Sequence, residues 1–469
     1  MASSDDLRWD RRLWLSLILL CGVLFLDGLD VSMVGMALPS IHDDLGLTTS
    51  QLQWVVSGYV LGYGGLLLLG GRAADLLGRK RTLIAGLAVF FVASLLGGLA
   101  SDPTLLVATR FIKGAAAAFT APASLSLITT TFAEGPARNK ALSVYTACGA
   151  SGFSFGLILG GLMTEVGWRY TFLLPVPFAL AILALAPRVL RSDHDQRRPD
   201  GSFDIPGALT ITSGMLLLVR SVVRAPDVGW GSVETLASFA TAFALLSAFV
   251  WIERRSRHPL VRLGILRSGS LVRANIGAMT MFGGYASFQF LATLFLQNEL
   301  GWSALHTALA FLPAGLLVAF GSPRVGALVD RFGTQRLIAA GFVSFVVGYA
   351  LFLRVSHGPA YGAEILPTIL LLGFGFALGF PSLSMQATSG IADQEQGLAS
   401  GLVNTSFQVG GAVVLAIVSA IVASSGTTDF LDAMRPALGV IVGVSVIGLV
   451  AAISGLVGSR EAVPATASA

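Results

Sequence analysis

The sequence LDGLDVSMVGMALP, residues 26–39, forms the second half of the first long apolar segment and carries two acids, Asp27 and Asp30. An ionised carboxylate deep in a membrane costs about 2.5–3.5 kcal/mol or more, so such residues are rare there unless they are paired or functional. The alternative is that both acids lie on a wet rim of a helix and do nothing. We therefore expect a basic partner elsewhere in the apolar part of the chain.

The composition indicates a membrane protein. The chain has 469 residues, of which 54% are hydrophobic and 12% are charged, whereas a soluble protein carries about 25% charged residues. Its 55 glycines fit closely packed membrane helices. The net charge of +4 is too small to indicate a nucleic-acid partner. We expect an all-α, polytopic protein whose main partner is the lipid bilayer.

A helix needs roughly 20 apolar residues to cross a bilayer. By that rule the sequence predicts fourteen spans. They are Leu13–Pro39, Leu52–Gly70, Thr82–Ala100, Thr104–Thr131, Ala141–Met163, Tyr170–Pro187, Ile205–Val223, Ser232–Ile252, Leu271–Gln297, Ser303–Gly326, Leu337–Leu353, Tyr361–Met385, Gly397–Ala423 and Pro436–Val457.

Basic residues set the predicted orientation. Most of the 30 lysines and arginines fall in alternate loops or at the termini, and the loops between them hold few. Because positively charged loops stay in the cytoplasm, both termini are expected there, which requires an even number of spans. One interior loop, around Asp393 and Glu395, has no basic residue and departs from the pattern.

An internal repeat predicts the domain organisation. GRAADLLGRKR, residues 71–81, and GALVDRFGTQR, residues 326–336, share the pattern G-x-x-x-D-x-x-G and follow the second and tenth predicted spans. Duplicated helix bundles are typical of secondary transporters. Polar linkers bracket the seventh and eighth spans, so we expect a six-helix bundle over 1–187, a linker with two inserted helices over 188–270, and a second six-helix bundle with a short tail over 271–469.

These features resemble the major facilitator superfamily, specifically its fourteen-helix drug:proton antiporter branch, over roughly Trp14 to Val457. The resemblance implies a major facilitator fold. Residues 71–81 resemble the family's loop motif, which implies a gating role; a basic loop that only fixes topology is the alternative. The implied gating residues are Gly71, Arg72, Asp75, Gly78, Arg79 and Lys80, with Asp330, Arg331 and Gly333 in the second copy.

Two further stretches carry the resemblance. LVATRFIKG, residues 106–114, resembles the family motif whose arginine is associated with proton coupling; Arg110 matches, while Lys113 replaces the usual glutamine. Snorkelling toward a helix end is the alternative for both bases. The fifth span resembles the antiporter glycine motif, with Leu157 in place of its proline. Simple helix packing would give the same spacing. Its residues are Gly152, Gly156, Gly160 and Gly161.

Residues 26–39 resemble the branch's first-helix motif, which includes Asp30 but not Asp27. The family places the first and fourth helices side by side, and residues three apart share one helix face. We therefore predict two acid–base pairs at successive levels, Asp30 with Arg110 and Asp27 with Lys113. These four residues are the predicted proton-coupling group. A permanent ion-pair lock between the helices is the alternative.

Other polar residues in apolar segments are candidates for a substrate cavity, although hydrogen bonding between helices explains them equally well. They are Gln289, Gln386, Asn404 and Gln408. WRYTF, residues 168–172, and Trp230 resemble outer-loop pieces of the branch and are expected to anchor the interface.

The resemblance implies a secondary exporter of small amphipathic compounds, such as drugs or antibiotics, in exchange for protons. The alternative is an uptake symporter or a lipid or metabolite transporter on the same fold. The sequence lacks a P-loop and H-E-x-x-H, so we expect no enzyme activity and no cofactor besides the proton gradient. Arginine far outnumbers lysine, which is typical of high-GC bacteria. We expect a monomer in a bacterial plasma membrane.

Overall fold

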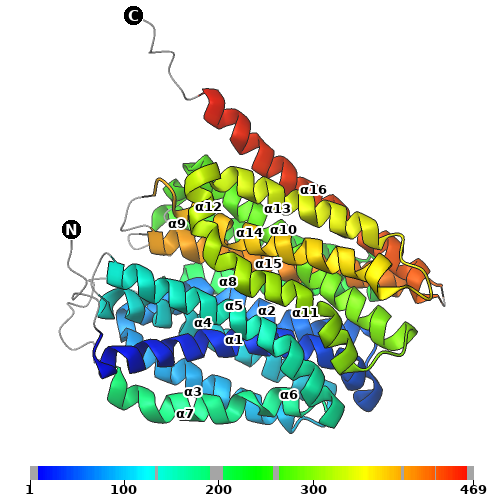
Figure 1. Ribbon diagram of the computed structural model, residues 1–469, viewed down its shortest axis with the longest axis horizontal. Helices are drawn as coiled ribbons and strands as arrows, with labels where there is room; N and C mark the ends of the chain where they lie inside the picture. The colour runs from blue at the N-terminus through cyan, green and yellow to red at the C-terminus, as the bar shows by residue number, and fades with distance from the viewer. Residues whose placement is uncertain are drawn as a thin grey trace, which may run out of the picture. The chain divides into compact units, whose positions relative to one another are not determined.

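A computed structural model describes residues 9–132, 136–190, 204–256, 263–391, 396–427 and 429–461, and these contain helices but no strand (Figure 1). The helices are α1 (Arg11–Leu45), α2 (Thr49–Leu77), α3 (Arg79–Gly98), α4 (Pro103–Thr131), α5 (Pro136–Val166), α6 (Tyr170–Leu173), α7 (Pro175–Val189), α8 (Ile205–Val228), α9 (Val233–Arg255), α10 (Gly269–Leu294), α11 (Ala304–Gly321), α12 (Val325–Phe332), α13 (Thr334–Phe352), α14 (Leu366–Thr388), α15 (Gln396–Ser424) and α16 (Phe430–Glu461). Four short 3-10 or π turns flank them: η1 (Leu263–Arg267), η2 (Phe295–Glu299), η3 (Ser322–Arg324) and η4 (Tyr361–Ile365).

Each predicted span falls on at least one helix. The predicted span Tyr170–Pro187 covers α6 and most of α7, and Ser303–Gly326 covers α11, η3 and the first two residues of α12. Within the described ranges, eleven helical stretches are long and apolar enough to cross a membrane. The remaining three predicted spans fall on α2, α5 and α8, which have 29, 31 and 24 residues. The fold is therefore all-α and polytopic, and the number fourteen stays a prediction.

The helices extend past the apolar runs because polar residues and glycines set their ends. The Asp10 side chain accepts a hydrogen bond from the Leu13 amide and caps the start of α1. The first helix does not end near Pro39, as expected from the sequence, but at Leu45, where Gly46 adopts a φ of 63°. Asp102 caps α4 in the same way, through the amides of Thr104 and Leu105.

The chain divides into two compact units. The first comprises residues 1–218, 239–260 and 301–312, and the second comprises residues 219–238, 261–300 and 313–469. In the first unit α1 packs mainly on α5, α2 packs on α4, and α3 packs on α4 and α7. The bundle boundaries expected from the sequence stay a prediction.

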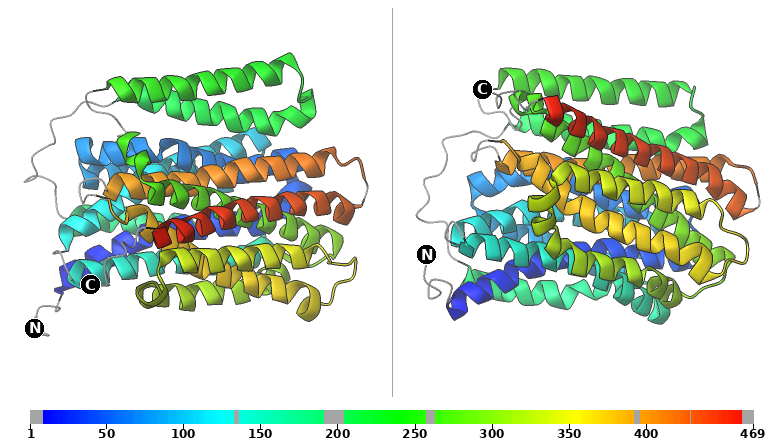
Figure 2. Two further views of the ribbon diagram at one scale, coloured as in Figure 1. Left: turned by 90° about the horizontal axis from the view of Figure 1, so that it is seen from above. Right: turned by 45° about the horizontal axis from the view of Figure 1, so that its top comes forward.

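The second unit is built around α10, which packs against α14, α15 and α16. Figure 2 shows α13 and α14 side by side, joined at one end by residues 353–365. Aromatic rings fill part of this unit. Phe288 of α10 packs against Tyr349 and Phe352 of α13, with ring centroids 5.3 and 4.9 Å away.

Candidate functional site

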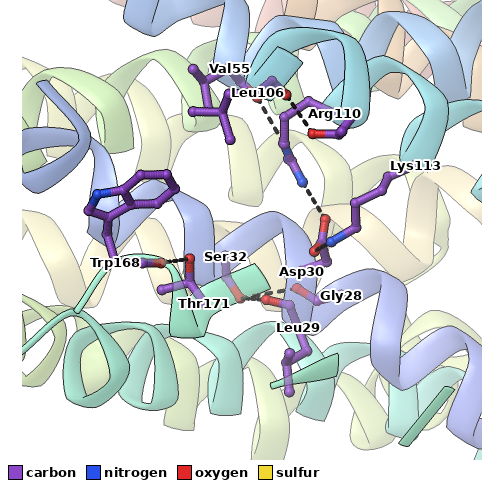
Figure 3. A network of polar contacts seen from close by, with 11 residues as sticks. Gly28, Leu29, Asp30, Ser32, Val55, Leu106, Arg110, Lys113, Trp168 and Thr171 are labelled. Atoms are coloured by element: carbon purple, nitrogen blue, oxygen red, sulfur yellow. Dashed lines mark hydrogen bonds and ion pairs between the residues drawn. The ribbon is translucent and has the colours of Figure 1, made fainter. Parts of the chain in front are cut away.

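One buried acid of α1 forms ion pairs with two bases of α4. Asp30 is fully buried, and its two carboxylate oxygens pair separately with the Arg110 guanidinium and the Lys113 ammonium (Figure 3). Arg110 is also fixed from α2, because its Nε donates a hydrogen bond of 2.9 Å to the Val55 carbonyl oxygen. We call Asp30, Arg110 and Lys113 the buried triad.

Aromatic rings enclose the two cations of the buried triad. The Arg110 Cζ lies 4.6 Å from the centroid of the Tyr59 ring, and the Lys113 Nζ lies 4.8 Å from that of Phe90. The Phe172 ring of α6 lies near both cations, with its centroid 6.0 Å from Arg110 Cζ and 5.3 Å from Lys113 Nζ. An aromatic face attracts a cation most strongly where water is excluded. The rings therefore stabilise charged side chains that burial alone would disfavour.

The predicted Asp30–Arg110 contact is present, but the predicted Asp27–Lys113 pair is wrong. Lys113 pairs with Asp30, and no described base forms an ion pair with Asp27. The reason is the direction of the side chains. Helical side chains lean toward the N-terminus of their own helix. In the antiparallel helices α1 and α4, this lean carries the long Lys113 side chain toward Asp30 and carries Asp27 away from it.

Asp27 is a buried acid that forms no ion pair with a described base. Its side chain is 5% exposed, and its Oδ2 has no hydrogen-bond partner among the residues that the structure describes. Three tyrosines interact electrostatically with its carboxylate, Tyr59 and Tyr63 of α2 and Tyr145 of α5, and Lys113 does so as well. The hydroxyls of Tyr145 and Ser124 share a hydrogen bond of 2.7 Å.

Small residues let the helices of the site approach closely. A Cβ added at Gly114 of α4 would lie 2.7 Å from the Tyr59 carbonyl carbon, and one added at Gly62 of α2 would lie 2.8 Å from the Ala115 amide nitrogen. Real Cβ atoms do not approach backbone so closely, so both positions require glycine. This contact between α2 and α4 places Val55 and Tyr59 beside Arg110.

The glycine motif of α5 has two packing partners. Three of its members, Gly152, Gly156 and Gly160, face α1. A Cβ added at these three positions would lie within 3 Å of a backbone Cα of α1. The distances are 2.9 Å from Gly152 to Phe25, 2.9 Å from Gly156 to Leu29 and 2.7 Å from Gly160 to Met33. Gly161 faces α11 instead, where an added Cβ would lie 2.8 Å from the Ala304 carbonyl oxygen.

The predicted gating motif lies mostly on helices rather than in a loop. Gly71 and Arg72 belong to α2, and Arg79 and Lys80 begin α3. Gly78 separates these two helices and has a φ of 100°. Gly333 separates α12 from α13 in the same way, with a φ of 79°. Since both glycines occupy the same place in the repeat, the two copies share a local structure. Asp330 and Arg331 lie exposed on α12, and the Asp75 side chain lies outside the part that the structure describes.

Lys80 joins the gating motif to the end of α7. Its Nζ donates hydrogen bonds of 2.8 and 2.7 Å to the carbonyl oxygens of Pro187 and Leu190. A cation at a helix C-terminus satisfies carbonyl groups that have no partner within the helix. A lysine of the gating motif thus stabilises the C-terminus of a neighbouring helix.

The four cavity candidates lie in the second unit, on α10, α14 and α15, and no described hydrogen bond or ion pair joins one of them to another. Gln289 and Gln386 are buried, and the Gln289 amide nitrogen has no hydrogen-bond partner among the described residues. Asn404 is exposed and donates to the Ser400 carbonyl oxygen of its own helix over 2.9 Å, and Gln408 is half-buried. Their substrate role stays a prediction.

Residues 168–172 contact both the end of α1 and the buried triad. The Trp168 indole and the Arg169 guanidinium both donate to Asp44 Oδ2 near the end of α1, over 3.0 and 2.8 Å. Phe172, four residues on, is fully buried against the cations of the buried triad. The sequence did not single out Phe90 or Tyr59, and it marked Phe172 only as part of an expected interface anchor. Among 29 phenylalanines and 7 tyrosines, nothing local marks the ones that face a charge.

Comparison with known proteins identifies the family. The sequence profile of the Major Facilitator Superfamily matches residues 20–415. The chain belongs to this superfamily. Among solved structures, the family fold is shared with the POT family transporter PepTSo (TM-score 0.69, 17% identity, covering 96% of this chain and 99% of that one) and the human organic anion transporter MFSD10 (TM-score 0.65, 15% identity, covering 94% and 99%).

Two relatives are similar over most of their length. The chain is 38% identical over 418 residues to the cephamycin export protein CmcT of Amycolatopsis lactamdurans, covering 88% of this chain and 85% of the relative. It is 37% identical over 430 residues to the puromycin resistance protein pur8 of Streptomyces alboniger, covering 89% and 83%. The chain is therefore a multi-pass membrane protein of a transporter family.

Proposed function

We propose that this transporter exports small amphipathic organic compounds by alternating access, in exchange for protons. Relatives named for cephamycin export and puromycin resistance support the direction and the substrate class. The observation that carries the proposal is the buried triad, which places one acid against two bases inside a membrane helix bundle. Ionisable residues at such a depth are typical of proton pathways.

In this proposal Asp30 is the acid that gains and loses the proton during the cycle. Arg110 and Lys113 stabilise its ionised form, and they must separate from it when the proton binds. Asp27, one turn away on α1, belongs to the same coupling group. The chain needs no cofactor besides the proton gradient, carries out no enzymatic reaction, and works as a monomer with both termini in the cytoplasm of a bacterial cell.

Inside-out membrane vesicles test the coupling. Energised vesicles should accumulate a dye substrate with the wild-type protein. Asp30→Asn should lower the initial rate about tenfold or more, which corresponds to a rise of at least about 1.4 kcal/mol in activation free energy. Asp43→Asn makes the same chemical change on an exposed acid of α1 and should leave the rate unchanged. If Asp30→Asn supports full proton-driven uptake, the triad is a structural lock and the coupling proposal is wrong.

The sidedness of the same assay tests the competing function. An exporter fills inside-out vesicles when the proton gradient is applied and empties them when an uncoupler is added. An uptake symporter on the same fold would concentrate its substrate in right-side-out vesicles instead.

A further inference from the structure

The turn between α8 and α9, on the predicted outer side of the membrane, carries a surplus of positive charge. Arg220 and Arg224 lie one helical turn apart on one face of α8, and we call them the arginine pair. Both contact one acid in the first turn of α9: Glu234 Oε1 lies 3.8 Å from Arg220 Nη2 and 3.0 Å from Arg224 Nε. Since one carboxylate faces two guanidinium groups, one positive charge of these three side chains is not balanced.

This arrangement differs from the other described arginine ion pairs on the predicted outer side, in which each acid has one arginine. Those pairs are Asp44 with Arg169 and Asp432 with Arg435. At 3.8 Å, Arg220 also lies beyond hydrogen-bond distance of the Glu234 carboxylate. The arginine pair can therefore accept a second anionic partner.

The arginine pair borders an open hollow with about 170 Å³ of empty space, and all of its lining residues belong to the second unit. Apart from the arginine pair and Glu234, the lining is mostly hydroxyl side chains. These residues are Ser221, Val228, Thr235 and Ser238. Arginine suits phosphate because its planar guanidinium group presents paired N–H donors that match two phosphate oxygens. The hollow therefore has the chemistry of a phosphate site.

The position of the arginine pair suits the phosphate of a lipid. Arg220 falls in the last turn of the seventh predicted span, so its long side chain would extend along the helix to the headgroup level. Trp230 in the adjoining turn is 54% exposed, and tryptophan is typical of the membrane interface. Eleven residues before Arg220, about three helical turns away on the same face of α8, Leu209 is exposed and would contact acyl chains.

We infer that the arginine pair binds the phosphate group of an anionic phospholipid in the predicted outer leaflet. The inference goes beyond export, because it names a lipid partner for the hairpin of α8 and α9. Phosphatidylglycerol brings one negative charge, which balances the surplus. Phosphatidylcholine brings an ammonium group as well, so its net charge is zero and the attraction is weaker. Glu234 competes with the lipid phosphate for the same guanidinium groups.

Native mass spectrometry of the purified full-length protein tests the inference. The probes are phosphatidylglycerol and phosphatidylcholine with identical acyl chains, added in equal amounts. The wild-type protein should retain more phosphatidylglycerol. Arg220→Gln combined with Arg224→Gln should lower the ratio of bound phosphatidylglycerol to phosphatidylcholine about tenfold, as expected for the loss of two basic residues near a membrane surface. Arg435→Gln is the matched control, since it removes an exposed arginine that has its own acid, and it should leave the ratio unchanged.

A second variant should change the ratio in the opposite direction, which a folding defect would not do. Glu234→Gln removes the competing carboxylate and should raise the ratio about twofold or more, as for the loss of a surface ion pair. Soluble glycerol 1-phosphate distinguishes a lipid site from a general phosphate site, and at equal concentration it should not displace the lipid. Equal retention of both lipids by the wild type, an unchanged ratio in the double variant, an equal fall in Arg435→Gln, a ratio in Glu234→Gln that does not rise, or displacement by glycerol 1-phosphate would each overturn the inference.

Discussion

Single residues decide which charges meet in the membrane. Asp30 pairs with both Arg110 and Lys113, while Asp27, one turn away, pairs with no described base. The difference comes from side-chain direction rather than depth, because a lysine of α4 leans toward the N-terminus of its helix and reaches the level above its own Cα. Sequence spacing predicts which residues share a helix face, but it does not determine which acid the charged end of a long side chain reaches.

Lys113→Met tests this assignment. Removal of one partner from a buried ion pair costs about 3–5 kcal/mol, because the remaining charge stays buried. We therefore expect Lys113→Met to lower the melting temperature of the detergent-solubilised protein clearly, and Asp27→Asn to change it little, since no described base loses a contact. If Asp27→Asn lowered the melting temperature as much as Lys113→Met does, Lys113 would be shown to pair with Asp27 after all.

Helices α1 and α5 owe their close contact to glycines spaced four residues apart. A Cβ at Gly156 would lie 2.6 Å from the Leu29 carbonyl oxygen and 2.9 Å from the Leu29 Cα, next to Asp30 in the sequence. Backbone cannot yield as a flexible side chain can, so any substitution at this position must separate the two helices. The packing of α5 thereby controls where α1 presents its acids.

Gly156→Ala should destabilise the protein by about 1–3 kcal/mol, as overpacking does in well-packed cores, and should also slow export because α1 shifts at Asp30. Gly439→Ala on α16 is the matched control: a Cβ there meets nothing within 4 Å, and alanine is about 1 kcal/mol better than glycine in a helix. Melting temperature and vesicle transport are the measurements. If Gly156→Ala left the melting temperature and the transport rate unchanged, α1 and α5 could move apart without loss of stability.

For the whole molecule, the sequence predicted the helices better than their contacts. Apolar runs locate the spans because lipid selects for them, but the ends of α1 depend on Asp10 and Gly46, outside its run. The contact of Asp30 with Arg110 was predictable from the family resemblance. The rings around it were not, since Phe90 and Phe172 come from α3 and α6 and nothing in their local sequence marks a cation opposite.

The number of spans and their orientation stay predictions for the whole molecule, and cysteine labelling tests them. The background is Cys21→Ala, Cys148→Ala. Val233→Cys lies at the exposed first residue of α9, at the end of its predicted span that faces outside, and Ala360→Cys lies at an exposed position in a loop predicted outside. Ala327→Cys lies at an exposed position of α12, predicted inside. A membrane-impermeant maleimide should label the first two in intact cells and the third only after permeabilisation, because basic residues hold the α12 side in the cytoplasm. If Val233→Cys stays unlabelled while Ala360→Cys reacts, α8 and α9 do not cross the membrane and the count falls to twelve.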